Sequence, residues 1–435
     1  MRLKEHIDKV SWSVADKFLF VIYGIVTIVQ FNAMKPEEMG LFALLITIFN
    51  WIFIISDSFA LQNLIQFGQR KHDRGFINFV VSSFHITITL GASLLMLLLG
   101  KPLSVFFNEP RLIEVFEFLI ILTFFNVPRT YAIKIFYRDT IMQRLFFTNA
   151  MYFGVMTFAT LSVVFYKRFL TFNELVYIYL IGTLISSLVA LFYIKNELTF
   201  RLKGQTRLKE IINFSVPYTL TSAIHLAPRQ LDVYLIQYFF QTKIVGIYFL
   251  AKNLFRAFEE IVNAANGLIY PAAVRQIAKN DFNSLFDMAT KSLSYILFFN
   301  MFTIILLNLG LTDLFIKWFL PEKYYLAIPF FNLLSFVAIG LPFTILGSVL
   351  IAFNQPTKTM KIMSISLVFW LLSFIVIGII NRPLLIPVPH IIYFFILSLL
   401  LFLETNKYIN ISFKDILRFI PDVFNIVINL LKNRK

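Results

Sequence analysis

The chain has 435 residues, of which 58% are apolar and 14% are charged, and it contains no cysteine. With a mean hydropathy of +0.77, this composition excludes a soluble globular enzyme, since a soluble domain carries about a quarter of its residues as charged groups. The lack of cysteine excludes thiolate catalysis and Cys-ligated metal centres. Apolar residues are spread over the whole length, which predicts one polytopic membrane protein.

A helix needs roughly 20 mostly apolar residues to cross the hydrocarbon core of a bilayer. The sequence predicts twelve such spans, and runs such as 396–403, apolar on every face, exclude transmembrane β-strands. The predicted spans are 11–31, 39–60, 76–99, 115–136, 145–166, 175–194, 211–240, 245–270, 292–314, 328–353, 362–380 and 384–403. The predicted fold class is an all-α integral membrane protein. No small-residue cleavage site follows the first span, so we expect it to stay in the mature protein.

The basic residues of the loops predict the orientation. Lys and Arg gather in the connections on the side of the N-terminus, including 70–74, 134–144 and 195–209, and are sparse on the opposite side. We therefore expect both termini in the cytoplasm. The net charge of +15 is then mainly a topology signal, and no nucleic-acid partner is needed to explain it.

The longest polar connection, 195–210, lies near the middle of the chain. Short similarities repeat across it at an offset of 206 residues, such as Gly40-Leu41-Phe42 and Gly246-Ile247-Tyr248. This predicts two six-helix halves, 1–194 and 211–403, joined by a cytoplasmic linker at 195–210, with the substrate path in a central cavity between them. Chance similarity between apolar helices is the alternative. The tail, 404–435, is predicted to be a basic amphipathic segment on the inner membrane surface.

Ionisable side chains at bilayer depth usually face a cavity or a partner, because burying their charge in hydrocarbon is costly. We expect a cationic wall that binds an anionic substrate, formed by Lys252, Arg256, Arg129, Lys17 and Arg229. The carboxylates considered for binding a coupling proton or Na+ are Asp16, Asp57, Glu259, Glu260 and Asp232.

Each of these residues also has a structural interpretation. The alternatives are interface solvation for Asp16 and Lys17, pairing with an inner-side base for Asp57, snorkelling for Arg129, and local ion pairs for Arg229 with Asp232 and for Arg256 with Glu259 or Glu260.

No catalytic or cofactor motif is found in the sequence. It has no phosphate-binding Gly-rich loop and no HExxH zinc motif, and its five histidines do not cluster. We therefore expect no catalytic residue, no metal site and no cofactor, and we favour transport coupled to H+ or Na+ over chemistry. The short predicted outer loops argue against a polytopic glycosyltransferase or ligase.

Four short stretches carry a family resemblance. They are 35–44 (KPEEMGLFAL), 56–61 (SDSFAL), 246–252 (GIYFLAK) and 269–274 (IYPAAV). They resemble Wzx-type polysaccharide flippases of the multidrug/oligosaccharidyl-lipid/polysaccharide (MOP) superfamily.

The resemblance implies a MATE-like fold and a cationic cavity. It implies that the protein moves an undecaprenyl-pyrophosphate-linked glycan to the outer leaflet of the bacterial cytoplasmic (inner) membrane by alternating access, for O-antigen, capsule or exopolysaccharide. The implied partners are the glycan, membrane lipids, a glycan polymerase and glycosyltransferases, and we expect a monomer. The alternatives are a MATE-type multidrug efflux antiporter, a glycosyltransferase or ligase, and a non-transporting scaffold.

Overall fold

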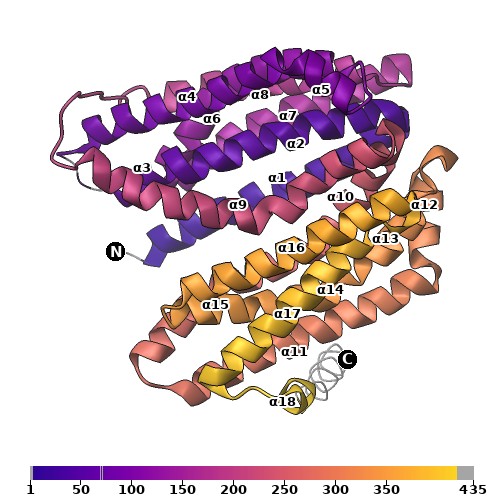
Figure 1. Cartoon of the computed structure of the whole chain (residues 1–435). Helices are drawn as coiled ribbons and strands as arrows, with labels where there is room; N and C mark the ends of the chain where they lie inside the picture. The colour runs from indigo at the N-terminus through magenta and orange to yellow at the C-terminus, as the bar shows by residue number, and fades with distance from the viewer. Residues whose placement is uncertain (1–2, 69, 71, 419–435) are drawn as a thin grey trace. The chain divides into compact units, whose positions relative to one another are not determined.

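The computed structural model describes residues 3–68, 70 and 72–418 (Figure 1). These residues form helices joined by short connections, and the only β-pairing among them is an isolated bridge between Met34 and Leu170. The predicted all-helical membrane architecture is confirmed. The chain forms two compact units, one up to Gly246 and one from Ile247.

The first unit is built from long helices and one π-helical turn, η1. Its elements are α1 (Leu3–Ala33), α2 (Pro36–Ser56), η1 (Asp57–Leu61), α3 (Gln62–Gln66), α4 (Arg74–Leu98), α5 (Gly100–Phe106), α6 (Leu112–Asp139), α7 (Met142–Lys167), α8 (Phe172–Ile194), α9 (Leu208–Phe239) and the start of α10 (Thr242–Ala278). The helix α7 packs against α1 and α8, and α6 packs against α4 and α8. Buried apolar side chains of η1, α3, α4, α6, α7, α8 and α9 form one shared core.

The second unit contains the rest of α10 and a bundle centred on α17. Its other elements are α11 (Phe282–Leu306), π-helix η2 (Leu307–Leu311), α12 (Thr312–Phe319), η3 (Glu322–Tyr324), α13 (Ala327–Ser335), α14 (Val337–Gly340), η4 (Leu341–Phe343), α15 (Thr344–Ala352), α16 (Pro356–Ile380), η5 (Pro383–Leu385), α17 (Val388–Ile409) and α18 (Phe413–Arg418). The helix α17 packs against α14, α15 and α16. The fully buried Trp370 of α16 lies at this contact, against the ring of His390 of α17.

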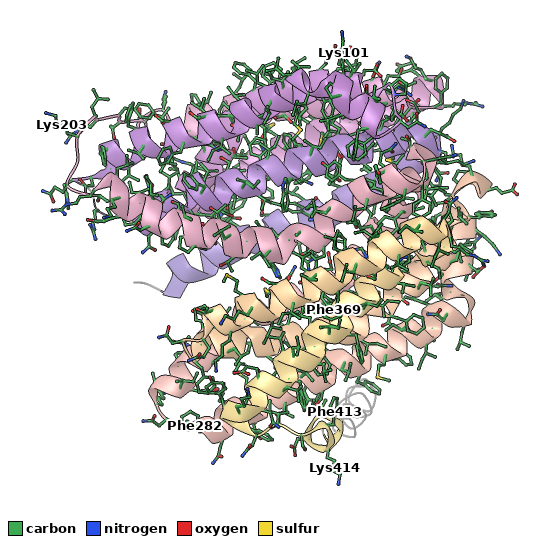
Figure 2. All side chains as sticks on the ribbon, viewed as in Figure 1. Lys101, Lys203, Phe282, Phe369, Phe413 and Lys414 are labelled. Atoms are coloured by element: carbon green, nitrogen blue, oxygen red, sulfur yellow. The ribbon has the colours of Figure 1, made fainter. Side chains whose placement is uncertain are left out.

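Every predicted span corresponds to helical structure. Nine helical segments of the described part of the chain are long and apolar enough to cross a membrane. The other three predicted spans are α6, α9 and α10, which are long helices but carry more charge and internal prolines. Large apolar side chains such as Phe369 are exposed on the helices (Figure 2), as expected for a lipid-facing surface.

The boundary between the compact units differs from the predicted boundary between the halves. The sequence assigns α9 to the second half, whereas in the structure α9 packs against α2 and η1 in the first unit. The duplication of the two halves therefore stays a prediction. The predicted tail includes the end of α17 and the short α18, whose buried Ile416 packs towards α11, while 419–435 lie outside the described residues.

The predicted linker, 195–210, is held against the N-terminal end of α4. Asp73 is almost fully buried and accepts hydrogen bonds from the backbone N–H groups of Gln205 and Thr206, at 2.7 and 3.0 Å, and from the Thr206 hydroxyl at 2.6 Å. The Arg201 N–H donates to the carbonyl of Gly75. These hydrogen bonds, led by the one from the Thr206 side chain, lower the pKa of Asp73 below its usual value. The linker is therefore part of the folded first unit.

We expect Asp73→Ala to release this linker. The lost hydrogen bonds to a charged acceptor are worth roughly 1.5–3 kcal/mol, so opening of the segment should rise at least about tenfold. Limited trypsin digestion measures this, because Arg201, Lys203 and Arg207 are exposed in the linker. Figure 2 labels Lys203. The native pKa is depressed, so the stabilisation is complete above the unfolded pKa and is lost as the pH falls through the native value. The control Asp281→Ala, which removes the cap of α11, should leave linker cleavage unchanged.

Candidate functional site

Polar side chains of the first unit gather where α2 gives way to the π-helix η1. A π-turn holds one residue more than an α-turn and is frequent at functional sites. Ser56 ends α2, Asp57 begins η1, and the fully buried Asn63 lies in α3 directly after the turn. The Asn63 amide donates to the Ser215 hydroxyl of α9 at 2.8 Å. Polar side chains of α2, η1, α3 and α9 therefore lie close together at the π-turn.

His85 of α4 is fully buried and joins this turn to α6. Its Nδ1 lies 2.6 Å from the Ser56 hydroxyl oxygen, and its Nε2 lies 2.9 Å from that of Thr130 and 3.3 Å from the Val127 carbonyl oxygen. The Thr130 hydroxyl donates to the Val127 carbonyl. In the neutral ring, Nε2 therefore carries the hydrogen and Nδ1 accepts from Ser56. The ring holds the π-turn against the segment of α6 that contains Pro128.

Asp57 forms an ion pair with Lys134 of α6. The Lys134 ammonium lies 2.9 Å from Oδ1 and 3.0 Å from Oδ2 of Asp57, and it donates to the Gln62 side-chain oxygen at 3.2 Å. This agrees with the structural interpretation of Asp57, pairing with an inner-side base. Lys134 was expected in the basic connection 134–144, but it lies inside α6 with a largely buried side chain.

A second cluster connects two predicted site residues, Asp16 of α1 and Arg129 of α6. The Asn149 amide of α7 donates to Asp16 Oδ1 at 2.8 Å, and its oxygen accepts from Arg129 Nη2 at 2.6 Å. Arg129 Nε also donates to the Ser186 hydroxyl at 3.0 Å, and the guanidinium lies 4.2 Å from the ring centroid of Tyr152. Asn149 therefore bridges a buried carboxylate and a guanidinium, and it orients both inside the bundle of α1, α6, α7 and α8.

Further polar side chains of α1 face the interior of this bundle. The buried Gln30 amide donates to the hydroxyls of Tyr23 and Thr160, each at 3.1 Å, and the Tyr23 hydroxyl donates to that of Tyr179 at 3.0 Å. These side chains tie α1 to α7 and α8. They are packing contacts within one bundle.

The remaining predicted residues of the first unit lie apart from these clusters. Lys17 is exposed, with its ammonium 5.5 Å from the ring centroid of Phe20. In α9, Asp232 is fully buried and accepts from the Val233 N–H at 2.8 Å, while Arg229, one turn earlier, is partly buried.

In α10, Arg256 and Glu260 are both about 60% exposed and form an i, i+4 ion pair at 3.3 Å. This agrees with the structural interpretation of Arg256, a local ion pair with Glu259 or Glu260. Lys252 lies one turn before it and is partly buried, and Glu259 is also partly buried. An exposed pair of this kind contributes little stability. Its position in the interior of a predicted span instead indicates that this face of α10 contacts water, because lipid would not solvate the charges.

At the other end of the first unit, the first turns of α2 and α10 cross at their glycines. A Cβ on Gly40 would collide with the carbonyl oxygen of Thr242, and a Cβ on Gly246 would collide with that of Pro36. Thr242 follows Pro36 by the same 206 residues that separate Gly246 from Gly40. The contact is therefore reciprocal, as a local two-fold axis requires.

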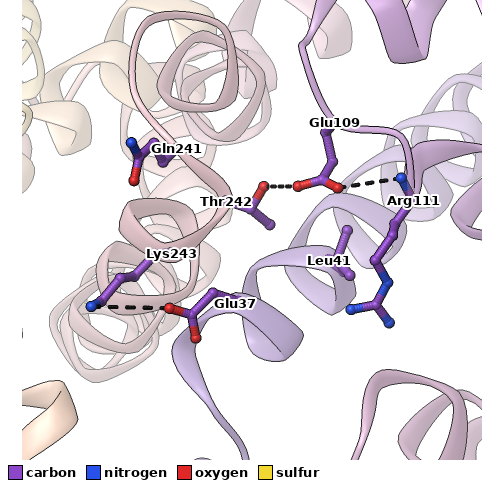
Figure 3. A pocket seen from close by; sticks show the side chains of 7 residues that line it. All are labelled: Glu37, Leu41, Glu109, Arg111, Gln241, Thr242 and Lys243. Atoms are coloured by element: carbon purple, nitrogen blue, oxygen red, sulfur yellow. Dashed lines mark hydrogen bonds and ion pairs between the residues drawn. The ribbon is translucent and has the colours of Figure 1, made fainter.

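A cavity of about 290 Å³ opens beside this crossing (Figure 3). Its wall holds two carboxylates and two cationic side chains, and each already has a partner. The Lys243 ammonium lies 4.0 Å from a carboxylate oxygen of Glu37. Glu109 accepts hydrogen bonds from the Thr242 hydroxyl and from the backbone N–H of Arg111. The Arg111 guanidinium also pairs with Glu38 at 2.5 Å, and this pair raises the pKa of Arg111. The two carboxylates and two cationic side chains of the cavity wall balance in charge, and their contacts link the first turns of α2 and α10.

Sequence reasoning missed Lys134, His85 and Asn149. The partners of Lys134 and Asn149 lie on other helices, and only the fold shows that Lys134 meets Asp57 and that Asn149 meets Asp16. The spacing of residues within one helix does not report contacts between helices. No group of three or more metal-ligating side chains is found in the described part of the chain.

Residues 33–329 match the family of polysaccharide biosynthesis proteins. The chain belongs to this family. No curated protein sequence matches it significantly.

Solved structures show the same fold at low sequence identity. The lipid II flippase MurJ superposes with a TM-score of 0.73 at 14% identity, covering 97% of this chain and 93% of MurJ. An inward-facing multidrug resistance MATE transporter of the MOP superfamily gives 0.72 at 12% identity, covering 88% and 94%. A MOP superfamily transporter from Pyrococcus furiosus, whose binding pocket is described as having reversed polarity, gives 0.57 at 12% identity, covering 91% and 93%. The chain therefore is a multi-pass membrane protein with the MOP transporter fold.

Proposed function

We propose that the protein is a flippase that moves an undecaprenyl-pyrophosphate-linked oligosaccharide from the inner to the outer leaflet of the bacterial cytoplasmic membrane. The match of 33–329 to the polysaccharide biosynthesis family carries this proposal. The fold shared with MurJ and MATE transporters supports a transport role over an enzymatic one. In this proposal both termini are cytoplasmic, the protein acts as a monomer, and the glycan serves O-antigen, capsule or exopolysaccharide.

The chemistry of α10 fits such a cargo. A lipid pyrophosphate is an anion that must pass through a low-dielectric region, where a basic group stabilises it far more than in bulk water. Lys252 and Arg256 lie one turn apart on α10, and the ion pair of Arg256 with Glu260 is exposed. A pyrophosphate can replace Glu260 as the partner of Arg256 without leaving a buried charge behind.

We expect Lys252→Ala and Arg256→Ala each to reduce glycan export at least about tenfold, because each removes one charge-assisted contact worth ~1.5–3 kcal/mol. Export is measured as surface glycan in a strain that lacks its own flippase, with the amount of protein in the membrane determined by immunoblot. Lys317→Ala is the matched control, because it breaks a similar exposed i, i+4 pair with Asp313 outside α10. Normal export by both α10 variants would contradict the assignment of the site.

The fold shared with MATE transporters makes multidrug efflux the second candidate. It predicts drug resistance on expression in a pump-deficient strain and no restoration of surface glycan. Lys252 and Arg256 share their face of α10 with Glu260, so the match to the polysaccharide biosynthesis family, and not the charge of this face, favours the glycan cargo.

A further inference from the structure

The linker between α8 and α9 is held by its backbone, so its side chains remain exposed. Near the start of α4, Asn78 donates to two backbone carbonyl oxygens of the linker, and Asp73 accepts from two of its backbone N–H groups. The N–H of Arg201 donates to a carbonyl of the first turn of α4. Within 199–210, Thr206 alone is buried. The linker is therefore a fixed loop that presents its side chains outwards.

These side chains are basic or apolar. Residues 199–209 contain four basic residues and no acidic one. All four basic side chains are exposed, and no ion pair of theirs is found in the part of the chain that the structure describes. They are Arg201, Lys203, Arg207 and Lys209. Two large apolar side chains alternate with the first two cations: Phe200 is 52% and Leu202 is 74% exposed. Figure 2 shows Lys203 on this loop at the edge of the first unit.

A surface of anionic phospholipid fits both kinds of side chain. Each Lys or Arg near such a surface strengthens binding about fivefold, through attraction to the negative head groups. Aromatic and aliphatic side chains gain free energy by entering the boundary between head groups and acyl chains. The preceding helix, α8, is a candidate membrane span, so the loop begins where that span leaves the bilayer. A soluble anion would engage the basic groups but leave Phe200 and Leu202 in water.

We propose that residues 199–209 form an anchor that binds anionic phospholipid at the membrane surface. Phe200 and Leu202 insert between the lipid head groups. Arg201 and Lys203 bind the lipid phosphates. Because α4 already holds the backbone, the loop loses little conformational entropy when it binds. The anchor fixes the inner end of the first unit to the bilayer surface, and it does not depend on which cargo the protein moves.

The test uses the full-length protein in lipid nanodiscs. The chain contains no cysteine, so Leu202→Cys accepts a single environment-sensitive NBD fluorophore. This reporter replaces one apolar side chain of the loop and leaves the basic ones in place. The discs contain phosphatidylcholine alone or with increasing phosphatidylglycerol. Emission reports the polarity around the fluorophore, and a nitroxide-labelled lipid quenches it only if the loop touches the bilayer.

We expect phosphatidylglycerol to shift the emission to the blue and to increase quenching by the nitroxide lipid. Added salt should reverse both effects, because exposed charges are screened. Removing two cations, with Arg201→Gln and Lys203→Gln together, should lower the equilibrium constant for insertion at least about tenfold. The matched control, Lys101→Gln with Arg382→Gln, removes the same charge at exposed positions outside the loop and should behave as the parent protein.

Equal emission and quenching in the two kinds of disc would overturn the proposal, as would a double variant that behaves like its control. A blue shift without quenching would also overturn it, because another part of the protein would then cover the loop. Phe200→Ser should weaken quenching and keep its dependence on salt. Inorganic phosphate added to phosphatidylcholine discs should give no shift, and a shift would assign the basic groups to a soluble anion.

Discussion

Gly40→Ala and Gly246→Ala should each force α2 and α10 apart at their first turns. The added methyl group would overlap a backbone carbonyl oxygen in each case, and on Gly246 it would also lie 2.8 Å from the Gly40 nitrogen. A backbone atom cannot rotate away as a side chain can. Overpacking of this kind typically costs about 1–3 kcal/mol, and the helices must shift to relieve it. We expect a lower thermal midpoint and at least tenfold less transport.

Two controls separate this effect from the general effect of a helical glycine. Gly91 and Gly154 lie in α4 and α7, and a Cβ on either would meet no atom within 4 Å. Gly91→Ala and Gly154→Ala should be neutral or stabilising by up to about 1 kcal/mol, because alanine favours the helix. If Gly40→Ala or Gly246→Ala had the same thermal midpoint as these controls, the crossing would not be crowded by a Cβ at that glycine.

The crossing can be followed directly, because the chain contains no cysteine to remove. Cysteines introduced at Glu37 and Lys243, whose charged groups lie 4.0 Å apart, report on the separation of the two turns through a short bismaleimide. Gly40→Ala in this background should lower the yield of the cross-link, and Gly154→Ala should not.

Arg129→Ala is expected to destabilise the first unit by about 3–5 kcal/mol, the usual result of removing one partner of a buried charged network. The substitution leaves Asp16 buried with Asn149 as its donor, and it leaves the oxygens of Asn149 and Ser186 without the guanidinium. Arg129→Lys should recover only part of the loss, because an ammonium cannot donate along the two fixed directions that these oxygens require. Thermal unfolding measures the difference, with the exposed Arg382→Ala as control.

The double variant Asp16→Asn, Arg129→Met tests the cause. It removes both charges, so it should be more stable than Arg129→Ala alone. The sequence assigns Arg129 to the substrate wall, and that interpretation makes a different prediction. A variant Arg129→Ala with native stability but no export would favour it over the structural network.

The helical architecture follows from composition, because long apolar segments in lipid satisfy their backbone hydrogen bonds only within helices. The sequence therefore predicts the positions of α4, α7, α8 and α16 closely. The local Arg256–Glu260 pair could also be predicted, since residues four apart share a helix face.

Contacts between helices could not be predicted in the same way. The pairing of Asp57 with Lys134 and the bridge from Asp16 through Asn149 to Arg129 depend on which helices become neighbours. The boundary after Gly246 could not be predicted either, because α9 belongs to the second half in the sequence but packs with α2 in the structure. Polarity within one helix indicates that a partner is needed, and the fold decides which partner it meets.

The π-turn at Asp57–Leu61 also affects how the sequence should be aligned with its relatives. A π-turn is an α-helix with one residue inserted, so every side chain after it is rotated by about 100° from the face that a regular helix would give it. Related helices without the insertion match this chain only if a one-residue gap is placed inside the span. An alignment that forbids gaps within helices would shift Gln62 and Asn63 onto the wrong faces.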